Sequence, residues 1–237
     1  MKKLAVITGG TKGIGKALAY IFVRNGFDIL TCSRNTKELE QLKKEVESSV
    51  EEASVSVFQA DISQKKEVQA LIDFIKSLKR GVDVLINNAG MFVSGQIHNE
   101  PGGLFEQMME TNLYGAYHLI RGLVGDMMDR RCGHIFNICS TASIKPYTNG
   151  GSYCISKYAL YGMSQVLREE MKPFNVKVTS VLPGATFTSS WDGEEIKPDR
   201  FMKPEDVASS IWNAFNMSAR TVVEEILLRP QLGDIDE

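Results

Sequence analysis

The chain has 237 residues, of which 43% are hydrophobic and 24% are charged, and its formal net charge at pH 7 is −2. This length suits one large α/β domain better than two, and both fractions are ordinary for a globular protein. The nearly balanced charge gives no electrostatic argument for binding nucleic acid or an anionic membrane surface, so neither partner is expected.

The N-terminal apolar run, Leu4–Ile7, is too short for a signal-peptide core or a membrane span, so we expect a cytoplasmic protein. The four cysteines show no C-x-x-C spacing. We therefore expect buried thiols in a reducing compartment, with neither disulfides nor a metal site. The cysteines are Cys32, Cys132, Cys139 and Cys154.

Apolar, β-branched runs alternate with helix-like segments along the chain. Strands are predicted at Leu4–Ile7, Phe27–Cys32, Val55–Phe58, Val82–Ile86, Ile135–Cys139, Val176–Leu182 and Ile226–Leu228. Helices are predicted near Gly13–Asn25, Lys37–Val50, Gln64–Lys79, in a stretch ending near Arg131, in the segment carrying Tyr153 as far as Met171, and at Pro204–Phe215. This alternation predicts a single α/β domain over residues 1–237, with a parallel sheet covered on both faces.

The first predicted strand leads into a glycine-rich loop, Thr8–Gly15, with the spacing G-x3-G-x-G. Glycines there let the chain turn tightly and let backbone N–H groups approach a pyrophosphate, and the following helix N-terminus adds positive potential. A purely structural turn is the alternative. The position directly after a strand favours nucleotide binding, although the commoner dinucleotide fingerprint is G-x-G-x-x-G.

The end of the second predicted strand indicates which nucleotide is bound. A cofactor with a free ribose 2′-hydroxyl usually meets an acidic residue there. This chain instead has Arg34, and Asp28 lies at the wrong end of the strand. The guanidinium of Arg34 suits a 2′-phosphate, which Lys12 in the glycine-rich loop could also reach. We therefore predict NADPH in preference to NADH; the alternative is that both residues are ordinary surface cations.

Ser140, Tyr153 and Lys157 form an S-x12-Y-x3-K pattern. Residues four apart lie on one face of a helix, and a nearby ammonium lowers the phenol pKa, normally near 10, by about 1–3 units. Ser140 follows an apolar strand and can hydrogen-bond a substrate oxygen. The three residues together predict a proton donor for a carbonyl group that receives a hydride. The alternative is a packed tyrosine and a solvated lysine.

Taken in order, these motifs resemble those of the short-chain dehydrogenase/reductase family over essentially the whole chain. The resemblance implies an NADPH-dependent carbonyl reductase or alcohol dehydrogenase with a Rossmann-like, doubly wound sheet of about seven strands and a site at their carboxyl ends. It implies the catalytic residues Asn112, Ser140, Tyr153 and Lys157. It implies cofactor contacts from Gly9, Thr11, Lys12, Gly13, Ile14, Gly15, Arg34, Asp61, Ile62, Asn88, Ala89, Gly90, Tyr153, Lys157, Pro183, Gly184, Thr186 and Thr188.

Some of these implied roles have plain alternatives. By the resemblance, Asp61 would bond the adenine amino group and Asn112 would hold a water that links Lys157 to solvent. Asp61 could instead cap the next helix, and Asn112 could be a polar residue that bends its own helix. Pro183-Gly184, which would bracket the nicotinamide, could simply end a strand.

The substrate is expected to meet the segments after Gly90, between Ser140 and Tyr153, and after Thr188. The residues expected to line this part of the pocket are Phe92, Tyr147 and Trp191. They would give it aromatic surface with few fixed charges, although Trp191 could equally pack the lid. The segment from Thr188 to Pro204 is short, so the sequence predicts a small lid and a compact carbonyl substrate.

Residues 183–191 and 220–235 resemble the pterin-ketone reductases of this family, whose substrates carry a ketone beside a flat ring. The rival activity is 3-oxoacyl-carrier-protein reduction, which needs a basic patch for an acidic carrier, and the basic pair Arg130-Arg131 is the candidate for it. A non-enzymatic NADPH-binding sensor or structural partner is a further alternative. The resemblance also implies a homodimer or homotetramer, and the acidic C-terminal tail is expected to be solvated or to border the pocket.

Overall fold

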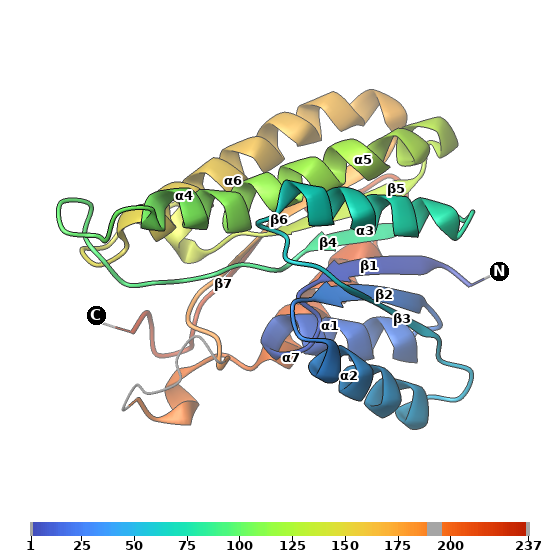
Figure 1. The fold of residues 1–237 in the computed structure, drawn as a ribbon, viewed down its shortest axis with the longest axis horizontal. Helices are drawn as coiled ribbons and strands as arrows, with labels where there is room; N and C mark the ends of the chain where they lie inside the picture. The colour runs from blue at the N-terminus through green and yellow to red at the C-terminus, as the bar shows by residue number, and fades with distance from the viewer. Residues whose placement is uncertain (1, 189–195, 236–237) are drawn as a thin grey trace.

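The computed structural model describes residues 2–188 and 196–235. Its centre is a sheet of seven strands in the order β3-β2-β1-β4-β5-β6-β7, and each neighbouring pair is parallel. The strands are β1 (Leu4–Thr8), β2 (Asp28–Ser33), β3 (Val55–Gln59), β4 (Val84–Asn87), β5 (Gly133–Ile138), β6 (Val176–Pro183) and β7 (Glu225–Leu228). The predicted α/β fold with a parallel, doubly wound sheet is confirmed (Figure 1).

Two layers of helices cover the sheet (Figure 1). One layer contains α1 (Gly13–Arg24), α2 (Thr36–Ser49) and α7 (Pro204–Phe215). The other contains α3 (Lys65–Ser77), α4 (Leu104–Met109), α5 (Gly115–Arg130) and α6 (Gly151–Met171). The helical stretch predicted to end near Arg131 is divided, because a π-helical turn, η1 (Glu110–Tyr114), joins α4 to α5.

Successive side chains of a strand point to opposite faces of the sheet, so each strand contributes to both helix layers. In β1, Ala5 and Ile7 pack in the core that includes α1 and α7, whereas Leu4 and Val6 pack in the core that includes α3 and α5. Both faces are therefore buried, which is why the strands read as nearly continuous apolar runs. Burying one such Leu or Ile side chain contributes about 1.5–3 kcal/mol.

The chain changes direction across the sheet between β1 and β4. It builds outward from β1 to β3 at one edge, then crosses back to place β4 beside β1 and continues to β7 at the other edge. The connections after β1 and β4 therefore lead to opposite sides of the sheet, and this arrangement opens a crevice at the carboxyl ends of the strands.

One cysteine differs from the expectation of burial. Cys32, Cys139 and Cys154 are buried, but Cys132 is exposed because it lies in the turn between α5 and β5. No disulfide joins cysteines of the described chain. Within residues 2–188 and 196–235, the helices are too short or too polar to cross a bilayer.

Candidate active site

A cavity of about 980 Å³ opens at the carboxyl ends of the strands. All of the residues predicted to contact the cofactor line it, and so do Ser140, Phe92 and Tyr147. Asn112 is buried behind this lining, and Trp191 lies outside the described residues. Topology alone brings these positions together, because every connection that contributes to the cavity leaves the same edge of the sheet.

The glycine-rich loop is held in place by the turn that follows β4. The hydroxyl of Thr8 accepts hydrogen bonds from Asn88 N at 3.0 Å and from Ala89 N at 2.9 Å. The side-chain amide of Asn88 in turn donates to Thr8 O at 2.8 Å and to Gly9 O at 3.1 Å. Asn88 therefore acts on the loop by fixing its backbone, and Thr8, which sequence reasoning did not single out, is its main partner.

The glycines of this loop form a cradle that side chains would fill. A Cβ on Gly15 would lie 2.1 Å from Gly9 O, and a Cβ on Gly13, whose φ is +50°, would lie 2.8 Å from Thr188 Cγ2. The loop after β6 thus closes over the loop after β1 at Thr188. Bare backbone at the N-terminus of α1 is the surface that a pyrophosphate requires, so the residues present fit a dinucleotide.

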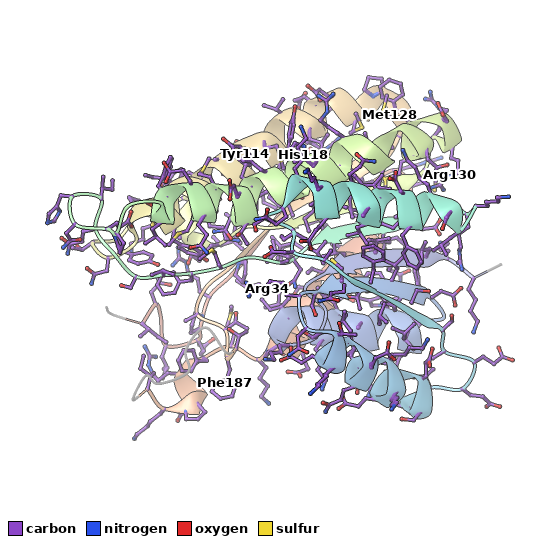
Figure 2. The ribbon with its side chains drawn as sticks, viewed as in Figure 1. Arg34, Tyr114, His118, Met128, Arg130 and Phe187 are labelled. Atoms are coloured by element: carbon purple, nitrogen blue, oxygen red, sulfur yellow. The ribbon has the colours of Figure 1, made fainter. Side chains whose placement is uncertain are left out.

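Two cations, Lys12 and Arg34, line the cavity where the adenosine is predicted to lie, and their neighbours differ. Lys12 Nζ lies 2.8 Å from Glu38 Oε1, and this hydrogen bond holds the pKa of Glu38 below its usual value. Arg34 is exposed just after β2 (Figure 2), and its side chain forms no ion pair within the described part of the chain. Arg34 is therefore the cation available to a 2′-phosphate.

Asp61 holds the turn that precedes α3. Its Oδ1 accepts from Ser63 N at 3.0 Å and from the Ser63 hydroxyl at 2.8 Å. The N-cap position of α3 belongs to Gln64, so the alternative that Asp61 caps this helix directly is wrong. Asp61 and Ile62 both line the cavity, and the second carboxylate oxygen of Asp61 leaves acceptor capacity there.

Tyr153 and Lys157 lie one turn apart on α6, as the sequence predicts. Lys157 Nζ is 5.8 Å from the centroid of the Tyr153 ring and donates to Ile138 O at 2.8 Å. Burial lowers the pKa of Lys157 to about 8. When Lys157 carries its proton, its positive charge favours the phenolate form of Tyr153 over the phenol.

Ser140 follows β5 and is buried at the cavity wall. Its Oγ accepts from Ala142 N at 3.1 Å and so caps the short turn Thr141–Ser143. A hydroxyl that accepts one hydrogen bond still has its proton to donate. Ser140 can therefore donate to an oxygen bound in the cavity without losing its structural partner.

Asn112 lies in the π-helical turn, and both polar atoms of its side chain form hydrogen bonds with neighbouring residues. Its Oδ1 accepts from Met91 N at 2.8 Å, while Nδ2 donates to Met91 O at 3.0 Å and to the Ser156 hydroxyl at 2.9 Å. Asn112 Oδ1 and Lys157 Nζ both lie near Gly90, at 3.1 and 3.5 Å from where a Cβ there would stand. Asn112 thus joins α6 to the segment after β4, and its role in a water relay remains a prediction.

The part of the cavity that is predicted to hold the substrate is more charged than expected. Phe92 and Tyr147 line it, but so do Lys145, Arg229 and Asp234. The carboxylate of Asp234 forms an ion pair with Arg229 and lies 3.6 Å from Lys145 Nζ. The C-terminal tail therefore borders the cavity. Of the two placements expected from the sequence, bordering the pocket is the one observed for Asp234 and Ile235, because the tail leaves the carboxyl end of β7, at the same edge as the other loops.

Comparison with known proteins agrees with this geometry. A family model for short chain dehydrogenases matches residues 3–197. A sepiapterin reductase from Chlorobaculum tepidum is 35% identical over 245 aligned positions, covering 100% of each chain. A metagenomic short-chain oxidoreductase, solved in complex with NADP, is 26% identical with a TM-score of 0.84 over 97% of each chain. The L-sorbose reductase of Gluconobacter frateurii, complexed with NADPH and L-sorbose, is 26% identical with a TM-score of 0.89 over 98% of this chain and 96% of that one.

Proposed function

The chain belongs to the short-chain dehydrogenase family of oxidoreductases, and on this premise we propose that it is an NADPH-dependent reductase of a small ketone. The observation that carries the proposal is the placement of Ser140, Tyr153 and Lys157 on the wall of the cavity that also holds the glycine-rich cradle. A proton donor, a hydrogen-bond donor and a dinucleotide site in one cavity are the parts that carbonyl reduction needs.

Each catalytic side chain has a separable task in this proposal. Ser140 donates a hydrogen bond to the substrate oxygen and keeps it within reach of Tyr153. The phenol of Tyr153 gives its proton to that oxygen as negative charge develops there. Lys157, buried and charged, stabilises the phenolate that remains. The bound cofactor supplies the hydride that the carbonyl carbon receives.

Two observations support NADPH as the cofactor. The guanidinium of Arg34, just after β2, lines the cavity and has no ion-pair partner among the described carboxylates. An acidic residue at this place would instead favour the 2′-hydroxyl of NADH. The solved relatives named above hold NADP or NADPH, as the sequence predicts for this chain.

For the substrate we propose a compact ketone, with a pterin side-chain ketone as the first candidate. The relative with this activity in its name matches the whole chain, and the aromatic rings of Phe92 and Tyr147 at the cavity suit a flat heterocycle. The rival, 3-oxoacyl-carrier-protein reduction, has less support. Arg130 lies at the far end of α5 from Tyr114 (Figure 2), bonded to Val82 O and Asp126, away from the cavity. The two cations that do line the cavity near Tyr147, Lys145 and Arg229, are both paired with Asp234.

The test compares wild type with Tyr153→Phe. We expect wild type to consume NADPH with sepiapterin and simple diketones, and the variant to lose at least about 10²-fold in kcat because it lacks the proton donor. Binding of NADPH, measured by fluorescence titration, should stay within about twofold of wild type, since the phenyl ring keeps its packing against Phe92. Full turnover by the variant contradicts the mechanism. Reduction of an acetoacetyl thioester alone favours the rival substrate, and no turnover of any carbonyl favours a sensor.

We also propose that the protein pairs with copies of itself through α5 and α6. The apolar side chains of α6 face two environments, because Leu160 and Leu167 are buried whereas Val166 is 59% exposed. The aromatic rings of Tyr117 and Tyr158 on the same two helices are exposed as well. Light scattering should find a dimer or tetramer, and Val166→Glu should shift it toward the monomer; a monomeric wild type contradicts the proposal.

A further inference from the structure

The N-terminus of α6, the helix that carries Tyr153, is capped from a distant part of the chain. Its N-cap residue is Gly150, and its first turn contains no acidic residue. The first N–H groups of a helix have no partner within that helix. Glu100, in the connection between β4 and α4, supplies the acceptor: its Oε1 accepts from Ser152 N at 2.8 Å, and its Oε2 accepts from the Ser152 hydroxyl.

Two glycines make the room that this carboxylate occupies. A Cβ on Gly151, whose φ is +27°, would lie 2.0 Å from Glu100 Oε1, and a Cβ on Gly95 would lie 2.7 Å from Glu100 Cγ. A side chain at either position would therefore displace Glu100. Gly95 also pairs with Gly150 in a parallel bridge, and its N–H donates to Asn149 O at 3.0 Å. The backbone around Glu100 is thus shaped to bring its carboxylate onto the helix terminus.

The segment that ends at Glu100 also touches the proton donor. Phe92, in the same connection, meets the ring of Tyr153 edge-on at 4.9 Å, and Tyr153 directly follows Ser152. The connection is therefore fastened to α6 at Phe92, at Gly95 and at Glu100. A negative charge at a helix N-terminus is also favoured by the partial positive charge of the terminal N–H groups.

We propose that Glu100 is a positioning residue for Tyr153, a role that rests on the reductase function proposed above. By anchoring the first turn of α6, Glu100 fixes the phenol relative to Ser140, which follows β5, and holds the ring of Phe92 beside it. Glu100 touches neither substrate nor cofactor in this role and acts through the helix. Small displacements of a reacting group lower the rate much more than they weaken binding.

The test measures kcat, the Kd of NADPH and the melting temperature for Glu100→Ala and Glu100→Gln. Glu100→Ala should lower kcat at least about tenfold while the Kd of NADPH stays within about threefold, because the cradle and Arg34 lie elsewhere. Glu100→Gln keeps an acceptor oxygen for Ser152 N and should restore kcat to within about threefold of wild type. The matched control is Glu47→Ala, since Glu47 Oε1 accepts from Val55 N at 3.0 Å far from the cavity. That variant should lower the melting temperature and leave kcat unchanged.

Unchanged kcat in folded Glu100→Ala, or an equal loss in Glu100→Gln, overturns the proposal. If Glu100→Ala does not fold, Ser152→Ala replaces it, because this change removes one of the two hydrogen bonds and retains the helix. A kcat lowered by about threefold in Ser152→Ala then supports the proposal, and an unchanged kcat overturns it. Failure of the reductase function itself is distinguishable, because wild type would then turn over no carbonyl compound.

Discussion

Arg34 and Lys12 look equivalent in the sequence, but their neighbours give them different tasks. Lys12 is paired with Glu38, so its charge largely offsets a carboxylate that would otherwise repel a phosphate at this end of the cavity. Arg34 carries a charge that no described carboxylate offsets, and its planar guanidinium can form two parallel hydrogen bonds to a phosphate. Recognition of the 2′-phosphate should therefore depend more on Arg34 than on Lys12.

Arg34→Ala should lower the ratio of kcat/KM for NADPH to kcat/KM for NADH by at least about tenfold, because a charge-assisted bidentate contact contributes roughly 1.5–3 kcal/mol. Most of the change should appear in the KM for NADPH. Steady-state kinetics with both cofactors measures this ratio, and Lys12→Ala is the matched control with a smaller expected effect. Equal ratios in wild type and Arg34→Ala would show that Arg34 is an ordinary surface cation.

At the scale of elements, the sequence predicts the glycine-rich loop but not the reason for each glycine. Glycine is required at position 10 because of a contact with β2, which is distant in sequence. The Thr31 hydroxyl accepts from Gly10 N at 3.1 Å and donates to Ile7 O at 2.7 Å, so it joins the loop to the end of β1. A Cβ on Gly10 would lie 2.2 Å from Thr31 Oγ1, which is fully buried. Only the strand pairing of β1 with β2 reveals this contact.

Gly10→Ala should therefore destabilise the protein by about 1–3 kcal/mol, because the buried Thr31 cannot move without breaking its hydrogen bonds. Urea unfolding measures this loss, and NADPH affinity should fall with it because the loop shifts. Gly125→Ala is the control: Gly125 is exposed in α5, and nothing beyond the adjacent backbone of its own helix lies within 4 Å of its Cβ position, so alanine there should stabilise the helix by about 0.5–1 kcal/mol. Equal effects of the two substitutions would contradict the account of Gly10.

The start of α6 shows the same limit of sequence reasoning. The spacing of Tyr153 and Lys157 predicts that both lie on one helix face, because that relation is local. The cap supplied by Glu100 joins residues 52 apart. No local pattern encodes it, so sequence reasoning missed Glu100 although it predicted the helix. Asn112 lies between these two cases. Its place in the family's pattern could be predicted from the sequence, but its hydrogen bonds to Met91 depend on the π-helical turn and could not.

Across the whole molecule, the alternation of apolar runs and helical segments was sufficient to predict a parallel sheet covered on both faces, whereas the place of the site at the carboxyl ends of the strands was predicted from the family resemblance. Strand ends differ from the predicted ones by one or two residues at several places, because pairing with a neighbouring strand, and not the apolar run, determines where a strand ends; Asn87 belongs to β4 through its pairing with Asn137. Buried polar side chains were not predicted. Asn87 Nδ2 donates to Asn137 Oδ1 at 2.7 Å across β4 and β5, and only the strand register brings the two together.

His134 on β5 is another buried polar group, and it should make global stability depend on pH. Its Nε2 lies 2.8 Å from Thr179 Oγ1, whose proton is donated to Val223 O at 2.6 Å, so the imidazole must donate through Nε2. Its Nδ1 has no hydrogen-bond partner among the described residues, and the ring stacks on Phe136 with centroids 3.9 Å apart. Burial, with a smaller contribution from Lys177, lowers the pKa of His134 to about 3.

Because the unfolded chain binds this proton near pH 6.5 and the folded protein only near pH 3, the contribution of His134 to stability is present above pH 6.5 and is lost as pH falls toward 3. The free energy of unfolding should decline by up to about 1.4 kcal/mol per pH unit from this residue alone. Urea unfolding at several pH values between 6.5 and 5 measures how the free energy of unfolding changes with pH. This interval is chosen because most carboxylates titrate below it. His134→Gln keeps a donor for Thr179 but cannot titrate, so its slope should be shallower, whereas the control His98→Gln removes only an exposed imidazole. Parallel curves for wild type and His134→Gln would show that the ring already titrates normally in the folded protein.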